Sequence, residues 1–153
     1  MSVSLQRESF DVAAEIAALR QAGDVGAVVT FTGICREGRG DQRITAMTLD
    51  HYPAMAQAEL ERIEAEALSR WPLLGTRIVH RYGRMEPGDD IVLVVTASLH
   101  RQAAFEAAAF LMDYLKTRAP FWKKEERGAG ADWVAAREED DTAAKRWRDD
   151  DKR

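Results

Sequence analysis

The spacing of apolar residues along the chain predicts four helices: residues 11–20, 53–71, 100–116 and 135–147. Ser9 is the expected N-cap of the first helix and Ser98 that of the third. Proline marks two boundaries, because Pro53 suits a first helical turn and Pro120 lies just beyond the end of the third helix. The core-facing stripe predicted for the third helix consists of Phe105, Ala108, Leu111, Met112 and Leu115.

Segments rich in β-branched and aromatic residues predict strands between these helices: residues 26–33, 44–52, 76–82, 91–98 and 121–127. We expect the first strand to be mostly buried and to pair with the second, and the most apolar strand, 91–98, to be central. Residues 1–9 are expected to form a further strand or an arm, and the Gly-containing run 35–43 an exposed loop. Strands and helices do not alternate strictly, so the pattern favours an α+β sandwich over a doubly wound sheet.

Composition narrows the class of protein. The chain has 153 residues, of which 46% are hydrophobic and 31% charged, and this fits one soluble globular domain. Its net charge of -4 argues against a general nucleic-acid binder. The single cysteine, Cys35, excludes an intrachain disulfide, and three scattered histidines do not favour a metal site. No apolar run approaches the ~20 residues of a membrane span and no secretory signal is visible, so we expect a cytoplasmic protein.

Several cations lie near the ends of the third predicted helix. His100 and Arg101 open this helix, Lys116 closes it, and Lys123 follows shortly after Pro120. Backbone N–H groups at the start of a helix favour anions, and adjacent cations strengthen such a site. The simpler alternative is that these side chains are solvated, as most charged residues are.

Lys116 lies among aromatic residues, because Tyr114 precedes it and Phe121 follows it closely. A lysine that loses solvation against aromatic rings has a lowered pKa and serves as a base or nucleophile. A lysine whose stem is buried while its ammonium reaches water fits the same pattern, and the sequence leaves both interpretations open. His51 and His80 lie in strand patterns and are expected to be structural.

Several segments of the sequence together resemble one enzyme family. They read GAVVTFTGICR, LDHYPAMA, EPGDDIVLVV, SLHRQAAFEA, MDYLKTRAPFWKKE and, later, WVAAREEDDTAAKRW. From about Gly26 to Trp147 the chain resembles the large, catalytic subunit of molybdopterin synthase, the MoaE family. The resemblance implies a single domain over residues 1–147, followed by a charged tail over 148–153. The implied fold is α+β, of the α/β-hammerhead type with an additional antiparallel β-sheet.

The resemblance also implies a reaction. Members of this family convert cyclic pyranopterin monophosphate (precursor Z) to molybdopterin by transferring two sulfurs, in molybdenum cofactor biosynthesis. The sulfur arrives as a thiocarboxylate on the C-terminus of a small ubiquitin-like sulfur-carrier subunit of the MoaD type. The implied assembly is a homodimer of large subunits within a heterotetramer, with no metal, other cofactor, nucleic acid or membrane. The alternative is a non-catalytic scaffold that binds the sulfur carrier; a phosphate-ester hydrolase would lack a visible nucleophile and metal ligands.

Matched position by position, the resemblance implies two catalytic lysines, Lys116 and Lys123. Lys116 would contact the thiocarboxylate carbon as a base or acyl acceptor, and Lys123 would stabilise negative charge. The implied substrate-binding residues are Arg36, His100, Arg101, Lys116, Lys123, Lys124, Glu125 and Arg137. Relatives often carry a polar residue where this chain has Ile34, and a valine-like residue where it has Cys35, so both are expected to bind substrate through their backbone. The transferred sulfur is expected to come from the partner.

The length of the third predicted helix adds a constraint. Fifteen residues separate Arg101 from Lys116, which is roughly 22 Å along a straight helix. Two long side chains close little more than half of that distance, so one compact pocket does not hold both ends of the same helix. We therefore hypothesise that His100 and Arg101 of one subunit face Lys116 and Lys123 of its dimer mate.

Overall fold

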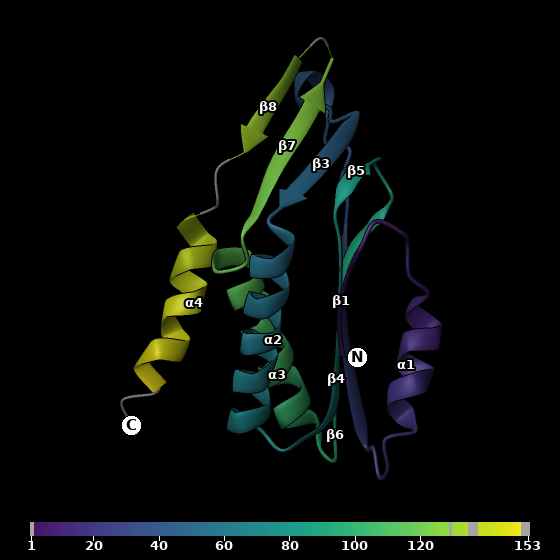
Figure 1. Cartoon of the computed structure of the whole chain (residues 1–153), viewed down its shortest axis with the longest axis vertical. Coiled ribbons are helices and arrows are strands. Elements are labelled where there is room, and N and C mark those ends of the chain that lie inside the picture. Colours follow the sequence, from purple (N-terminus) through teal and green to yellow (C-terminus); the bar gives the residue numbers. More distant parts are fainter. Residues whose placement is uncertain (1, 129, 135–137, 151–153) are drawn as a thin grey trace.

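Two four-stranded β-sheets and four α-helices form the described part of the computed structural model, residues 2–128, 130–134 and 138–150. The first sheet has the order β1 (Val3–Gln6), β4 (Leu73–Arg81), β6 (Asp90–Ser98) and β2 (Ala27–Ile34). The second has the order β5 (Gly83–Met85), β3 (Ala46–His51), β7 (Phe121–Arg127) and β8 (Gly130–Val134). The helices are α1 (Val12–Arg20), α2 (Pro53–Arg70), α3 (Arg101–Thr117) and α4 (Glu138–Asp150), and a short 3-10 helix spans Gly40–Gln42. Figure 1 shows the second sheet extending beyond one end of the first.

Helices cover both faces of the first sheet (Figure 1). On one face, β4 and β6 pack against α2 and α3 through Leu60, Ile63, Ile78, Val94, Phe110 and Leu111. On the other face, the same two strands pack against α1 through Val12, Ile16, Leu19, Val79, Leu93 and Val95. Adjacent residues of a strand point to opposite faces, so one pair of apolar strands supplies both cores. The burial of β6 from Val92 to Ser98, between two neighbouring strands, confirms that it is central.

The second sheet corrects one predicted strand pairing. β3 was expected to pair with β2, but its neighbours are β5 and β7, and every pairing in this sheet is antiparallel. In the described residues, β2 pairs with β6. Alternation of side chains predicts that a segment is a strand but does not say which strand lies beside it. The all-antiparallel second sheet agrees with the additional sheet that the family resemblance implies.

Several side chains predicted to be buried are exposed. As the edge strand of the first sheet, β2 is only partly covered, and Phe31 is 40% exposed. Phe105 of α3 is 60% exposed, because this helix turns its alanines toward the sheet. Ala104 and Ala107 are fully buried, and the hydroxyl of Thr96 donates to the carbonyl of Ala104 at 2.7 Å. Small side chains let α3 approach β6 closely, which a search for large apolar residues does not detect.

The caps of two helices differ from the sequence prediction. Asp11, not Ser9, caps α1, and its carboxylate accepts a hydrogen bond from the Ala14 N–H at 3.1 Å. His100 is the N-cap of α3 without a side-chain bond, and the hydroxyl of Ser98 donates to the His100 carbonyl instead. The predicted boundaries of α2 at Pro53 and before Pro72 are confirmed.

We expect Asp11→Ala to lower the free energy of unfolding by about 1 kcal/mol, because one N-terminal N–H of α1 loses its acceptor. Ser9→Ala is the matched control and should change stability by less than about 0.5 kcal/mol. Urea unfolding of the two variants measures both values. Equal destabilisation by the two substitutions would contradict the assignment of the cap.

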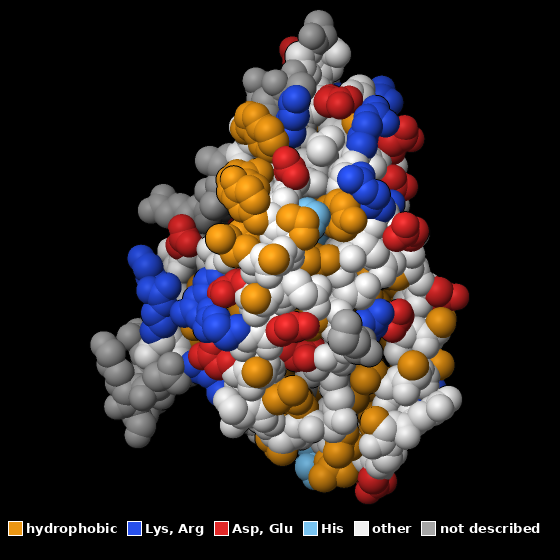
Figure 2. Space-filling model, viewed as in Figure 1, with side chains coloured by type: hydrophobic (Ala, Val, Ile, Leu, Met, Phe, Trp, Pro, Cys, Tyr) orange, Lys and Arg blue, Asp and Glu red, His pale blue; other side chains and the backbone are white. Residues whose placement is uncertain are grey.

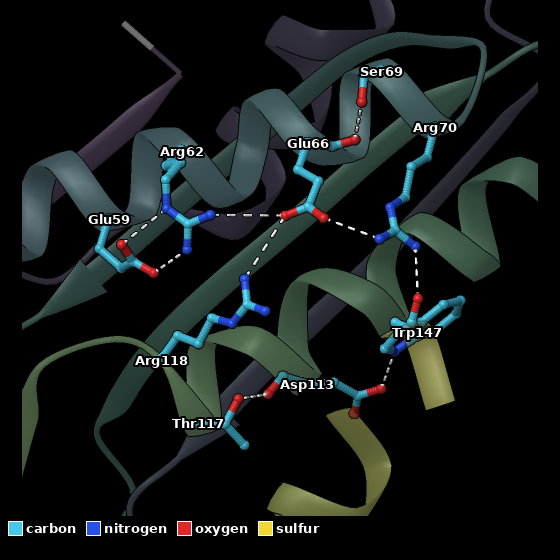
Figure 3. Close-up of polar contacts among 9 residues, drawn as sticks. All are labelled: Glu59, Arg62, Glu66, Ser69, Arg70, Asp113, Thr117, Arg118 and Trp147. Atoms are coloured by element: carbon cyan, nitrogen blue, oxygen red, sulfur yellow. Dashed lines mark hydrogen bonds and ion pairs between the residues drawn. The ribbon is translucent and has the colours of Figure 1, made fainter. Parts of the chain in front are cut away.

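α4 is attached to α3 and α2 by polar contacts (Figure 3). The carboxylate of Asp113 accepts from the Trp147 indole at 2.6 Å and from the Arg146 guanidinium at 2.8 Å. Arg70 of α2 donates to the Trp147 carbonyl at 3.2 Å. The indole of Trp147 also meets Phe110 edge-on, with 5.6 Å between ring centroids. α4 continues through Asp150 and so includes the first three residues of the segment expected to be a charged tail.

Candidate functional site

Lys116 and Lys123 flank the connection from α3 to β7. Lys116 occupies the last turn of α3 and is exposed. The chain then turns through residues 118–120 into β7, where Lys123 is the third residue. The side chain of Lys123 is 40% exposed, and its Nζ lies 3.3 Å from Glu125 Oε1. Both predicted catalytic lysines therefore lie in the region where the second sheet leaves the helical layer (Figure 1).

Glu125 is buried and holds two cations. Its carboxylate forms ion pairs with Lys123 and Arg127, and Arg127 also donates to the side chain of Gln42 at 2.9 Å. Only 7% of Glu125 is exposed. Burying a carboxylate is costly unless cations and hydrogen bonds satisfy it, and these two partners do so. Glu125, which the family resemblance implies as a substrate-binding residue, therefore holds the ammonium group of Lys123 in the structure.

Cys35 lies beside this ion pair. It is 3% exposed and packs with Met47, Leu49 and Met85. Burial, followed by the nearby negative charges of Asp89 and Glu125, raises the pKa of its thiol, while Lys123 opposes this. A buried thiol with a raised pKa is a poor nucleophile.

The backbone of Cys35 is engaged within the protein. Its N–H donates to the Asp89 carbonyl at 2.9 Å, and its carbonyl accepts from the Gly88 N–H at 2.8 Å. Ile34, the preceding residue, lies at a register shift at the end of β2 and has a side chain that is 53% exposed. A substrate contact through the Cys35 backbone would have to share these atoms.

Cys35→Ala is expected to retain most of the activity, since its side chain fills a buried site and carries no reactive thiolate. The rate of product formation and the rate of thiol alkylation in the folded wild type together check this. A complete loss of activity in a folded Cys35→Ala protein would contradict it.

Three other predicted anion-binding residues, Arg36, His100 and Arg101, are exposed. Arg36 is exposed and opens a loop in which Arg43 pairs with Glu37. His100 and Arg101 are exposed at the opposite end of α3 from Lys116. Because α3 is continuous from Arg101 to Thr117, the structure does not bring its two ends together within one chain. Arg137 lies outside the described residues.

Lys124 points to the other face of the second sheet from Lys123, since consecutive residues of β7 alternate. Its Nζ lies 5.8 Å from the ring centroid of Trp133, which is 60% exposed. Trp133 therefore does not lie in the core. Figure 2 shows hydrophobic side chains gathered over β7, β8 and the start of α2. A shallow cavity of about 470 Å³ there is lined by Asp50, His51, Tyr52, Trp122 and Trp133.

His80 was expected to be structural, and the structure places it close to the candidate site. Its pKa is lowered to about 4, mainly by burial and in smaller part by the positive charge of Lys116. Lys116 therefore lies within electrostatic reach of this ring. Sequence reasoning missed both this proximity and the pairing of Arg127 with Glu125. His80 and Lys116 come from β4 and α3, which no spacing along the chain brings together. Arg127 lies two residues from Glu125 on β7, so the two-residue period of a strand could have indicated that pair.

The described part of the chain offers no metal site and no membrane helix. Within it, no group of three or more His, Cys, Asp or Glu side chains is arranged to hold a metal ion. None of the described helices is both long and apolar enough to cross a membrane. The charged groups that converge are two cations, Lys123 and Arg127, around the buried carboxylate of Glu125.

Comparison with known proteins gives consistent matches over most of the chain. A family model described as "MoaE protein" matches residues 5–118. The molybdopterin synthase catalytic subunit of Mesorhizobium japonicum is 61% identical over 150 residues, which cover 96% of this chain and 93% of that one. The protein of the same name from Escherichia coli K12 is 50% identical over 140 residues, covering 92% and 93%. The solved structure of the molybdopterin biosynthesis MoaE protein from Burkholderia ambifaria is 46% identical, covers 96% of this chain and 97% of its own, and superposes with a TM-score of 0.82.

Proposed function

Since this chain belongs to the MoaE protein family, we propose that it is the catalytic subunit of a molybdopterin synthase. It acts as a sulfurtransferase that converts cyclic pyranopterin monophosphate to molybdopterin. The observation that carries this proposal is the placement of Lys116 and Lys123 on either side of one turn, with Lys123 directed by a buried carboxylate. Both a phosphate and a thiocarboxylate are anions that such cations bind.

The sulfur donor in this proposal is a small ubiquitin-like carrier protein that ends in a thiocarboxylate. In each transfer a carbon–sulfur bond to the pterin forms while a carbon–oxygen bond at the same pterin carbon breaks and the oxygen departs. Water then cleaves the carbon–sulfur bond of the carrier, which is released as a carboxylate and leaves the sulfur on the pterin. Two transfers, each consuming one thiocarboxylate, complete the dithiolene. Cytoplasmic location and assembly of two large and two small subunits belong to the same proposal.

Lys116 and Lys123 have different tasks in this reaction. Lys116 meets the thiocarboxylate carbon, either as the base for the attacking group or as the temporary acceptor of the acyl group. Lys123, whose ammonium is held by Glu125, stabilises the negative charge that develops on the substrate. Arg36 and Lys124 contribute to the binding of the two anions in this proposal, as does the segment with Arg137.

His100 and Arg101 complete the site of the dimer mate. Their distance from Lys116 along a continuous α3 supports a site shared between two subunits. A mixed dimer of Arg101→Ala and Lys116→Ala subunits tests this. In a shared arrangement one of the two sites keeps both residues, so we expect about half of the wild-type activity, whereas sites built within single chains would give almost none.

The deciding experiment for the function supplies the thiocarboxylated carrier and the cyclic pterin to the purified protein. Formation of the dithiolene product, measured by mass spectrometry, is the expected result. A scaffold that binds the carrier without chemistry is the second candidate, because the family resemblance also covers recognition of the carrier. Binding of the carrier with no product would favour this scaffold.

A further inference from the structure

Four rings form a column that joins the two sheets. His80 of β4 stacks on Phe121, the first residue of β7, with 3.9 Å between ring centroids and 11° between planes. His51 of β3 also stacks on Phe121, at 5.8 Å and 20°. Tyr82 follows β4 and lies 4.3 Å from His51. We call His80, Phe121, His51 and Tyr82 the ring column.

The ring of His80 is neutral and fixed in one orientation. Its Nδ1 lies 2.9 Å from the carbonyl oxygen of Arg81. A carbonyl only accepts hydrogen bonds, so the hydrogen of the neutral imidazole is on Nδ1. Its pKa is lowered to about 4, mainly by burial and in smaller part by the charges of Lys116 on α3 and His51 on β3. Phe121 is therefore held by an uncharged, hydrogen-bonded ring.

Phe121 lies between the two lysines along the chain. Lys116 precedes it by five residues and Lys123 follows it by two. Residues two apart in a strand share a face, so Phe121 and Lys123 project from the same face of β7, opposite His51 and Leu49 of β3. The end of α3 is held by Tyr114 and Leu115, which are buried in the main core, and Phe121 packs against this same core from β7. A shift of Phe121 therefore moves Lys123 relative to Lys116.

We propose that His80 and Phe121 are positioning residues, whose stacked rings set the start of β7 and with it the spacing of Lys116 and Lys123. The expected effect on kcat rests on the proposed sulfur transfer. Neither ring touches a reacting atom in this account. A displacement of about 1 Å at a reacting group costs on the order of 100-fold in rate, so loss of the stack should be visible in kcat.

Three variants test the proposal. His80→Ala removes the ring, Phe121→Leu removes its flat partner, and His80→Phe keeps the stack without the imidazole. Phe10→Leu is the matched control, since Phe10 is also a half-buried phenylalanine but packs on the α1 side of the first sheet. Cooperative thermal unfolding first establishes that each protein is folded. If His80→Ala does not fold, Phe121→Leu, which keeps an apolar side chain, provides the test instead.

We expect kcat to fall about 10- to 100-fold in His80→Ala and Phe121→Leu. KM for the pterin and for the carrier should change less than about 3-fold, and His80→Phe and Phe10→Leu should stay within about 3-fold of the wild-type kcat. A folded His80→Ala or Phe121→Leu protein with the wild-type kcat overturns the proposal. It is also overturned if His80→Phe is as impaired as His80→Ala, because the nitrogen atoms would then matter rather than the stack.

A second measurement needs neither substrate. An amine-acylating reagent is applied to each folded variant, and peptide mass spectrometry gives the acylation rates of Lys116 and Lys123 relative to exposed Lys145. The positioning role predicts that the ratio of these two rates changes at least about 3-fold in Phe121→Leu and not in Phe10→Leu. An unchanged ratio overturns the positioning role of His80 and Phe121, whether or not the wild type forms product. Absence of product from the wild type would by itself reject only the proposed function.

Discussion

Replacing Lys116 with alanine is expected to slow the formation of molybdopterin at least about 100-fold, the usual size of a lost acid–base or nucleophilic group. Its side chain is exposed, so the free energy of unfolding should change by less than about 0.5 kcal/mol. Lys145→Ala on α4 is the matched control and should leave the rate unchanged. Single-turnover product formation and urea unfolding measure the two effects.

Lys123→Ala should differ from Lys116→Ala in stability. Its ammonium is one of two cations that hold the buried carboxylate of Glu125. Leaving a buried group with one partner fewer costs about 1–3 kcal/mol, so this variant should lose both activity and stability. Wild-type stability of Lys123→Ala would show that the buried carboxylate of Glu125 does not depend on Lys123.

Wild-type turnover of Lys116→Ala would show that Lys116 takes no part in the mechanism.

Acid should destabilise the protein through His80. The pKa of this imidazole is about 4 in the folded protein and near 6.5 when unfolded, because burial disfavours the charged ring. The unfolded chain therefore takes up the proton first as the pH falls. The stabilising contribution of the neutral ring is complete above about pH 6.5 and is lost between pH 6.5 and 4, where it amounts to about 3 kcal/mol.

The measurement is urea unfolding at several values between pH 7.5 and 4, on the wild type and His80→Phe. The variant should lose about 1 kcal/mol at neutral pH with the hydrogen bond to Arg81, yet its stability should fall less steeply with acid. His100→Phe at the exposed N-cap of α3 is the control for replacing a histidine. Parallel curves for the wild type and His80→Phe would show that the pKa of His80 is not depressed by folding.

The sequence predicts well those features that depend on local chemistry. Proline at position 53 begins α2, Pro72 lies just beyond its end, and the most apolar strand is the buried β6. Long-range relations were predicted less well. The neighbours of β3 are β5 and β7, which depends on the path of the whole chain. The buried face of α3 includes Ala104 and Ala107, which carry little apolar signal.

For the candidate site, the sequence supplies the lysines but not their supports. Lys116 and Lys123 stand out through the family resemblance and through their aromatic surroundings. Glu125 pairs with Lys123 and Arg127, each two residues away on β7, which the two-residue period of a strand could have indicated. His80 stacks on Phe121 from the other sheet, which no spacing along one strand predicts. The distance between the ends of α3 was predictable, because helical rise is constant once a helix is assigned.

The strand order of the first sheet also constrains how the protein is made. The apolar strand β2 pairs in the described residues with β6, and β1 pairs with β4, although long segments of chain separate each pair. During synthesis at about 5–20 residues per second, β2 leaves the ribosome seconds before its neighbour exists. Until then Val28 and Val29, which are half-buried in the completed sheet, have no strand beside them. We therefore expect the nascent chain to be more prone to aggregation during this interval than after β6 has been made.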